Sequence, residues 1–242
     1  MQTIAAQAVN VSKHYDSGTA SVTALDHVNV DFVQGQFTAI MGPSGSGKST
    51  LMHTLAGLDS ITEGHVFIGD TELTALQDTE LTELRRDRVG FVFQAFNLVP
   101  TLTAEQNILL PLQLAGKSPE NEWFQEIVRI LALEDRLDHK PHELSGGQQQ
   151  RVAIARALLA KPDVIFGDEP TGNLDSKVGT QVLQLLRRCS QHMGQTIIMV
   201  THDPHAASFA DRVVLLEDGK VAGELIQPSS DDVLIALGRL GA

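Results

Sequence analysis

The chain has 242 residues, of which 42% are hydrophobic, and a formal net charge of −12, which is the composition of a globular protein rather than a disordered one. The acidic balance disfavours a broad basic surface of the kind that neutralises phosphates, so we expect no nucleic-acid partner. A single cysteine, Cys189, cannot form an internal disulfide, which favours a reducing compartment and a role in helix packing.

The N-terminal residues 1–16 contain neither a basic leader nor a long apolar stretch, so we expect no signal peptide. Uninterrupted apolar runs, such as residues 197–200, are only a few residues long, whereas a bilayer-spanning helix needs roughly 18 or more. The sequence therefore predicts an intracellular protein without a transmembrane segment of its own. Any association with a membrane would depend on a partner.

Strands and helices are predicted to alternate in the first part of the chain. Residues 22–32 and 37–41 have the pattern of two strands joined by a turn at Gln34 and Gly35, and residues 49–57 have that of a helix. Short strands are expected at residues 64–68 and 89–93, with a charged helical stretch at 78–87 between them. Strand, glycine-rich loop and helix thus follow one another around residue 42.

Helical periodicity dominates between residue 96 and about residue 160, most clearly in 122–133 and 148–159. Strands and helices alternate again afterwards, and a short helix is expected at the end of the chain. These later elements are 163–166, 177–192, 196–200, 213–216 and 231–240. Such alternation predicts an α/β fold with a mostly parallel sheet, interrupted by a helical insertion.

The glycine-rich segment at residues 42–49, here called the phosphate loop, matches the pattern G-x-x-x-x-G-K-[ST] between a predicted strand and a predicted helix. Its backbone N–H groups can wrap a phosphate, and the helix dipole favours the same anion. Lys48 is expected to reach the β- and γ-phosphates, and the Ser49 hydroxyl to bind Mg²⁺. The loop alone leaves open a kinase, a GTPase, a helicase or a transport ATPase. The predicted phosphate-binding residues are Gly42, Pro43, Ser44, Gly45, Ser46, Gly47, Lys48, Ser49 and Thr50.

Two adjacent carboxylates, Asp168 and Glu169, follow the apolar run at 163–166. Asp168 is expected to hold Mg²⁺, because the strand leads directly into it. Glu169 is predicted to point the other way, since neighbouring strand residues face opposite sides, and to act as the catalytic base. Gly167 is read as permitting a close approach of two backbones.

A second candidate anion site begins at Ser145, which is predicted to cap a helix next to Gly146 and Gly147. From the residue types alone, an ordinary capped helix is the better interpretation. The segment 144–148, here called the signature segment, reads Leu-Ser-Gly-Gly-Gln, and Gln149, Gln150 and Arg151 follow it.

These motifs closely resemble those of the ATP-binding-cassette (ABC) family. The resemblance covers nearly the whole chain and includes, in the family's order, the phosphate loop, Gln94, the signature segment, the acidic strand, the segment 173–175 and His202. It implies one ABC ATPase domain over 1–242. Residues 1–94 would form an antiparallel β subdomain and the first part of a RecA-like core, 95–160 a helical subdomain, and 161–242 the rest of the core.

The resemblance also implies a head-to-tail homodimer that binds ATP and Mg²⁺, in which each ATP lies between the phosphate loop of one subunit and the signature segment of the other. Ser145, Gly146, Gly147 and Gln148 would then contact the partner's ATP. His202 would contact the γ-phosphate, and Gln94 would sense Mg²⁺ and the attacking water. Asp175 resembles the D-loop residue, and Tyr15 takes the place of the ring that stacks on adenine.

Residues 96–112 and 168–175 resemble one branch of the family in particular, which includes macrolide and antimicrobial-peptide exporters, lipoprotein-release systems, haem exporters and the cell-division ATPase. The resemblance implies a separate membrane permease, with this chain at the cytoplasmic face of the membrane. It leaves open an exporter of a hydrophobic or amphipathic substrate and a regulatory ATPase that moves no substrate. Residues 96–102 are expected either to face the permease or to pack inside the protein.

Overall fold

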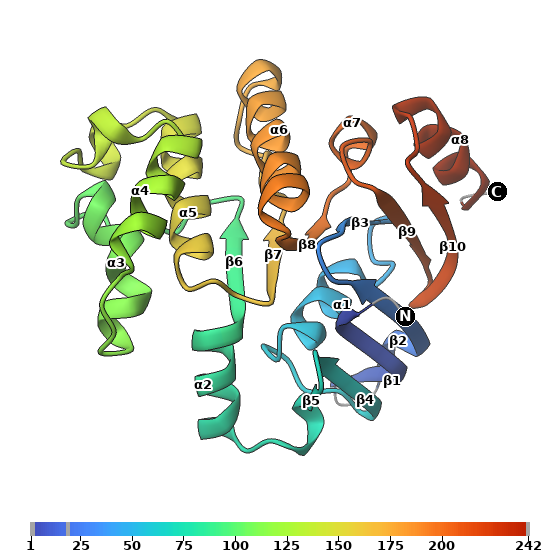
Figure 1. Ribbon diagram of the computed structural model, residues 1–242. Coiled ribbons are helices and arrows are strands. Elements are labelled where there is room, and N and C mark those ends of the chain that lie inside the picture. The colour runs from blue at the N-terminus through green and yellow to red at the C-terminus, as the bar shows by residue number, and fades with distance from the viewer. Residues whose placement is uncertain (1–2, 18–19, 241–242) are drawn as a thin grey trace.

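Two β-sheets and a group of helices form the protein in the computed structural model, which describes residues 3–17 and 20–240. The larger sheet has the order β10-β9-β3-β8-β7-β6, and all its strands are parallel except β10, which pairs antiparallel with β9. Its strands are β3 (Phe37–Met41), β6 (Val89–Phe93), β7 (Val164–Asp168), β8 (Thr196–Val200), β9 (Arg212–Glu217) and β10 (Lys220–Ile226). Figure 1 shows helices on both faces of this sheet.

The central strands are buried along their whole length, because other elements pack on both faces of the sheet. All five residues of β3 and all five of β8 are buried, as expected for parallel strands with continuous apolar sequences. The carboxyl ends of β3, β7 and β8 therefore lie at one edge of the sheet, where ligands bind in open α/β folds. The phosphate loop, the Asp168–Glu169 pair and His202 all follow these strand ends.

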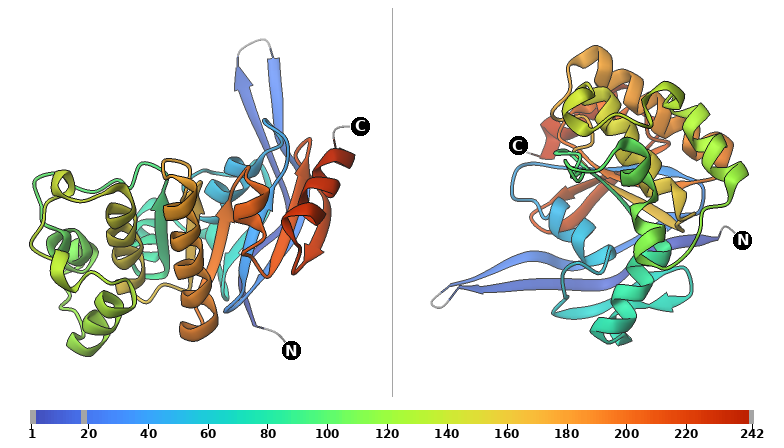
Figure 2. Two further views of the ribbon diagram at one scale, coloured as in Figure 1. Left: turned by 90° about the horizontal axis from the view of Figure 1, so that it is seen from above. Right: turned by 90° about the vertical axis from the view of Figure 1, so that its left-hand side faces the viewer.

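A second sheet is antiparallel, with the order β2-β1-β4-β5. It consists of β1 (Ile4–Ser17), β2 (Ala20–Val33), β4 (Glu63–Ile68) and β5 (Thr71–Glu72). Figure 2 shows β1 and β2 as a long hairpin that projects from the rest of the protein. The inner face of this sheet packs against β3 and α1 through Phe32, Ile40, Leu51 and Ile68, all fully buried.

Eight α-helices complete the described part of the chain. They are α1 (Lys48–Leu55), α2 (Asp78–Arg88), α3 (Ala104–Leu114), α4 (Asn121–Ile130), α5 (Gly146–Leu159), α6 (Ser176–Met193), α7 (Pro204–Ala207) and α8 (Ser230–Leu240). Helices α3, α4 and α5 form the helical region at one end of the molecule, and α5 packs against α3, α4, α6 and β6. No helix among residues 3–17 and 20–240 is both long and apolar enough to cross a membrane.

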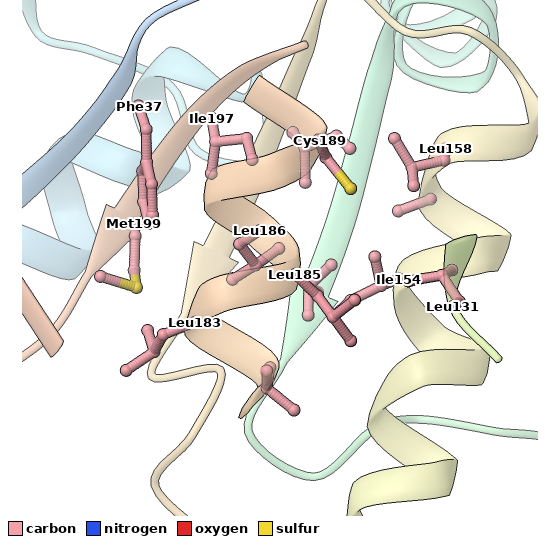
Figure 3. Close-up of a cluster of buried hydrophobic side chains, with 14 of the residues drawn as sticks. Phe37, Leu131, Ile154, Leu158, Leu183, Leu185, Leu186, Cys189, Ile197 and Met199 are labelled. Atoms are coloured by element: carbon pink, nitrogen blue, oxygen red, sulfur yellow. The ribbon is translucent and has the colours of Figure 1, made fainter. Parts of the chain in front are cut away.

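Helix α6 joins the helical region to the larger sheet. Figure 3 shows labelled side chains of α5, α6, β3 and β8 in one hydrophobic cluster, with Cys189 of α6 among them. Cys189 is fully buried, and burial raises the pKa of its thiol to about 11. The prediction that Cys189 packs between helices is therefore confirmed.

The predicted fold class is confirmed: a mostly parallel core sheet, an antiparallel N-terminal β region and an inserted helical region. The strands predicted at 37–41, 89–93 and 196–200 match β3, β6 and β8 to the residue. Strands β1, β5 and β10 had no counterpart among the predicted elements, and helix α3 lies in the predicted helical stretch 96–160, where no bounds were predicted for it.

Candidate functional site

The backbone of the phosphate loop requires glycine at several positions. Gly42, Gly45 and Gly47 have φ values of 155°, 80° and 98°, which L side chains rarely adopt. A Cβ on Gly42 would lie 2.0 Å from the carbonyl oxygen of Leu216, and one on Gly47 would lie 2.4 Å from that of Ala24. The backbone at Leu216 and at Ala24 therefore leaves no room for a side chain at these two glycines.

Lys48 begins α1 and folds back over the loop. Its ammonium Nζ donates to the carbonyl oxygens of Gly42 at 2.9 Å and Pro43 at 2.7 Å. Burial lowers the pKa of Lys48, while the charge of Glu169 acts in the opposite direction. A phosphate in the loop would replace neutral carbonyl acceptors with charged oxygens, which form the stronger hydrogen bonds.

Glu169 and His202 meet across the ends of two adjacent strands. Glu169 Oε1 lies 2.7 Å from His202 Nδ1, and the Thr201 hydroxyl donates to Glu169 Oε2 at 3.3 Å. The His202 side chain is 77% exposed and that of Glu169 is 21% exposed. A carboxylate held by two partners at the mouth of the site is placed to polarise a water molecule, with the imidazole beside it.

Glu169 separates from Asp168 for a different reason from the one that the sequence predicted. Strand β7 ends at Asp168, and Glu169 lies beyond it in the left-handed region, with φ of 47°. Its backbone N–H donates to the carbonyl of Val200 at 3.0 Å. A backbone turn, rather than strand alternation, therefore aims Glu169 at His202. Such a conformation is uncommon for a residue with a Cβ and often occurs at functional sites.

Gly167 does not make the close backbone approach that its sequence suggested. A Cβ there would lie 3.5 Å from Pro170 and 3.8 Å from Met199, both at side-chain atoms and both at ordinary contact distances. The expectation was wrong because the strands beside β7 keep regular sheet spacing.

Gln94 forms two hydrogen bonds with a single partner, Asn173. Gln94 Nε2 donates to Asn173 Oδ1 at 3.1 Å, and Asn173 Nδ2 donates to the Gln94 carbonyl at 3.0 Å. The Gln94 side chain also covers Gly172, where a Cβ would lie 2.7 Å from Nε2. This pairing joins the segment after β6 to the segment before α6.

The predicted Mg²⁺ ligands have the donor chemistry that this ion prefers. Ser49 lies in the first turn of α1, Asp168 ends β7 and Gln94 follows β6. Among the described residues, no group of three or more His, Cys, Asp or Glu side chains could hold a metal. The hydroxyl of Ser49, the carboxylate of Asp168 and the amide oxygen of Gln94 are hard oxygen donors, the kind that Mg²⁺ takes together with phosphate oxygens in nucleotide sites.

The signature segment forms a helix end whose polar groups satisfy one another. Ser145 caps α5, its Oγ accepting from the Gln148 N–H at 3.4 Å, and the Gln148 side chain accepts from the Ser145 N–H at 2.8 Å. A Cβ on Gly146 would lie 3.1 Å from Leu174 Cδ2, and one on Gly147 would lie 2.4 Å from Val178 Cγ1. These glycines thus let α5 pack closely on the start of α6.

Asp175 caps α6, because its side chain accepts from the backbone N–H groups of Lys177 at 3.1 Å and Val178 at 3.0 Å. Tyr15 lies near the end of β1 and is 42% exposed. Its hydroxyl donates to Asp59 at 2.6 Å. The ring thus stands beside α1, the helix that carries the phosphate loop.

Sequence reasoning missed two polar residues of α5, one buried and one half-buried. Gln150 is fully buried, and its Nε2 donates to the carbonyl of Pro170 at 2.6 Å and that of Phe93 at 3.5 Å. Arg156 donates to the carbonyls of Asn97 at 2.6 Å and Phe96 at 3.0 Å, and burial lowers its pKa. Gln150 lies four residues before Ile154, and Arg156 lies four residues after Val152. This helical spacing places both polar residues next to an apolar face, which was the signal available in the sequence.

The chain is similar to known ABC proteins over most of its length. A family model described as ABC transporter matches residues 25–172. An uncharacterized ABC transporter ATP-binding protein of Methanocaldococcus jannaschii is 47% identical over 222 residues, which cover 89% of this chain and 94% of that protein. A solved dimeric ATP-binding cassette in a post-hydrolysis state, bound to ADP and Pi, has a TM-score of 0.81 and 44% identity, and covers 93% of this chain and 99% of that chain.

The solved cassette is that same Methanocaldococcus jannaschii protein, and a second relative is named as both an ATP-binding and a permease protein. The macrolide export ATP-binding/permease protein MacB of Vibrio parahaemolyticus is 44% identical over 219 residues. The match covers 90% of this chain and 33% of MacB, so the chain spans about a third of that protein.

Proposed function

The chain belongs to the ABC transporter family as an ATP-binding and ATP-hydrolysing subunit, and we propose that it powers an exporter from the cytoplasmic face of a membrane. The observation that carries this proposal is the meeting of three elements at one sheet edge. The phosphate loop, Asp168 and the Glu169–His202 pair follow β3, β7 and β8, which are hydrogen-bonded neighbours in the sheet.

In the proposed reaction, the phosphate loop binds ATP and Lys48 exchanges its two carbonyl partners for the β- and γ-phosphates. Ser49, Asp168 and Gln94 are the residues that would hold Mg²⁺, which neutralises charge on the phosphates. Glu169 accepts a proton from the attacking water, and its hydrogen bonds to Thr201 and His202 fix its direction. His202, being exposed on its other side, is free to approach the γ-phosphate.

The working form is proposed to be a head-to-tail homodimer. Figures 1 and 2 show α5 within the helical region, separated from α1 by the larger sheet. The signature segment therefore lies apart from the phosphate loop of its own chain. The solved post-hydrolysis cassette with high similarity to this chain is itself dimeric, which supports a nucleotide held between two subunits.

A groove between α2, β6 and α3 offers a surface for the permease. It has a volume of about 370 Å³, and one wall contains the stacked rings of Phe91 and Phe93, whose centroids are 5.5 Å apart. Leu114 at its edge is 77% exposed. Arginines border this apolar floor, so it suits an amphipathic helix with acidic residues. The groove is lined in part by Arg86, Phe91, Phe93, Leu110, Leu114 and Arg156.

The segment 96–102 makes no part of this groove lining. Leu98 packs against the larger core instead, and Phe96 lies near the position that a Cβ on Gly146 would take. For these two residues, the packing alternative fits better than contact with the permease. The similarity to MacB, named for macrolide export, supports an exporter for a hydrophobic or amphipathic substrate, such as a macrolide, peptide, lipoprotein or haem.

The variant Glu169→Gln tests the reaction. The amide cannot accept the proton from water, so hydrolysis should fall by about 10²- to 10⁴-fold, while the ATP Kd stays close to that of the wild type. Phosphate release, ATP titration and size-exclusion chromatography with ATP measure the three effects, and we expect a stable ATP-bound dimer. Glu126→Gln, an exposed carboxylate of α4, is the matched control. Undiminished turnover in Glu169→Gln contradicts the proposed role.

A further inference from the structure

A single carboxylate, Asp59, holds both Tyr15 and Lys13. Its Oδ2 accepts from the Tyr15 hydroxyl at 2.6 Å, and its Oδ1 accepts from Lys13 Nζ at 2.8 Å. Lys13 and Tyr15 are two residues apart on β1, so their side chains share one face of the strand. Lys13 Nζ lies 4.8 Å from the centroid of the Tyr15 ring, within the range of a cation–π contact.

Lys13 is an unusual residue to find in this position, because it is only 7% exposed. A buried ammonium needs partners for its N–H groups, and Lys13 has Asp59 and the carbonyl oxygen of Ser60 at 2.5 Å. Burial alone would raise the pKa of Asp59, but the hydrogen bonds from Lys13 and Tyr15 outweigh it and lower the pKa. The hydrogen bond to Asp59 and burial raise the pKa of Tyr15. The phenol thus remains a neutral donor and Asp59 a charged acceptor.

The segment that carries Asp59 is attached at both ends. The backbone N–H groups of Leu58 and Asp59 donate to the carbonyl of His53 near the end of α1, at 2.8 and 3.3 Å. Thr62 is joined to β1, where its N–H donates to the carbonyl of Ser12 at 2.8 Å. Asp59 is therefore fixed relative to α1, and the Tyr15 ring is fixed relative to the phosphate loop at the other end of that helix.

We propose that Asp59 and Lys13 are positioning residues for the nucleotide base, which hold the Tyr15 ring ready to stack on adenine. The inference rests on the proposed function, in which Tyr15 contacts the base. Lys13 occupies one face of the ring, so the base stacks on the opposite face. Because the ring is already fixed, binding does not have to restrict its rotation. Lys13 remains paired with Asp59 and makes no contact with the phosphates.

This proposal differs from a purely structural role in what it predicts for ligands with and without a base. We expect Asp59→Asn to raise the Kd of ATP by about 3- to 10-fold, because a displaced ring loses part of a stacking contact that is worth about 5- to 100-fold. The Kd of inorganic tripolyphosphate should stay within about twofold, since the phosphate loop is untouched. Isothermal titration calorimetry of both ligands, with a thermal melt of each variant, measures these effects.

The neighbouring exposed carboxylate Glu63 supplies the matched control Glu63→Gln, which should change neither Kd. Lys13→Met keeps the length of the side chain and should show the same selective loss for ATP. Tyr15→Phe keeps the ring and removes only the hydrogen bond to Asp59, so it tests the same contact if the Asp59 variant does not fold.

Two results would overturn the positioning role. One is an equal loss for ATP and tripolyphosphate that follows a fall in melting temperature, which would make Asp59 a structural link between α1 and β1. The other is an unchanged ATP affinity in Asp59→Asn and in Tyr15→Phe. Failure of the base contact itself appears separately, because Tyr15→Ala would then leave the ratio of the two Kd values unchanged. The hydrolysis assay of Glu169→Gln does not depend on any of these outcomes.

Discussion

The N-termini of α1 and α5 are both predicted to contact phosphate, yet the chain builds them in different ways. The cap of α1 is Gly47, in a left-handed conformation and without a side-chain hydrogen bond to the first turn. The cap of α5 is Ser145, which exchanges hydrogen bonds with Gln148. The first helix end leaves backbone N–H groups without side-chain partners, whereas the second uses its own side chains.

The glycines of the two segments differ in the same way. Gly42, Gly45 and Gly47 have positive φ values that shape the turns of the loop. Gly146 and Gly147 are helical residues, and their lack of a Cβ admits Leu174 and Val178. The conformation of the phosphate loop thus depends on its own glycines and not on a neighbouring helix. The signature segment satisfies its cap with its own side chains, and in the proposed dimer the other subunit brings the phosphate that it contacts.

The largest expected effect is on ATP hydrolysis, in an experiment that mixes two inactive variants, one in the phosphate loop and one in the signature segment. Lys48→Met removes the charge in the phosphate loop, and Ser145→Arg places a bulky side chain on the signature segment. Each variant alone should hydrolyse almost no ATP. Mixed in equal amounts, they should recover up to about one quarter of the wild-type rate, because half the dimers are mixed and each contains one intact composite site.

Phosphate release across a series of mixing ratios measures the recovery. The control is a mixture of Lys48→Met with Glu169→Gln, which leaves every site defective and should stay inactive. If the Lys48→Met and Ser145→Arg mixture also stays inactive while mixed dimers form, the two segments do not act across subunits. The difference between the phosphate loop and the signature segment would then need an explanation that involves a single chain.

A smaller effect, on the stability of the protein, is expected at Gln150. This residue links α5 to the end of β6 and to the segment after β7. Gln150→Leu leaves the buried carbonyl of Pro170 without its donor at 2.6 Å, a loss of about 1–3 kcal/mol. The unpartnered Oε1 of Gln150 disappears at the same time, which keeps the cost near the lower value. A fall in Tm of about 2–4 °C should follow. Exposed Gln125 of α4 provides the control Gln125→Leu, and equal melting of Gln150→Leu and wild type would contradict the proposed link.

Much of the fold was predictable because the core strands have a continuous apolar pattern. Residues 197–200 are apolar and lie between Thr196 and Thr201, and they form most of β8. Strand β1 was missed because its pairing with β2 and β4 has several register shifts, and these interrupt the two-residue period on which the prediction depends. Helix α3 contains Pro111, and a proline weakens the helical pattern of a sequence. The helix nevertheless continues to Leu114.

The candidate site was predictable in its residue types but not in its contacts. The spacing of the phosphate loop specifies Lys48, and the apolar strand that ends in carboxylates specifies Asp168 and Glu169. No local pattern reveals that Glu169 turns toward His202, or that Gln94 pairs with Asn173. These contacts join segments 33 and 79 residues apart, so they depend on how the sheet brings its strands together.

A comparison of three helix caps, in which Ser145 should show the smallest loss of stability, tests whether Ser145 is more than a cap. Asp175 accepts two N–H groups at 3.1 and 3.0 Å, Thr103 of α3 accepts one at 3.2 Å, and Ser145 accepts one at 3.4 Å. Replacement by alanine should therefore lower the free energy of unfolding by about 1–2 kcal/mol at Asp175, about 1 at Thr103 and less at Ser145.

Urea denaturation of the three variants without nucleotide measures this order, and ATP hydrolysis is measured on the same samples. Ser145→Ala should lose far more activity than its small loss of stability explains, because its hydroxyl is proposed to contact the partner's ATP. Thr103→Ala should lose more stability and little activity. If Ser145→Ala is the most destabilised of the three and its activity falls only in proportion, Ser145 is an ordinary cap. The α5 helix end would then lose its role as a second phosphate contact.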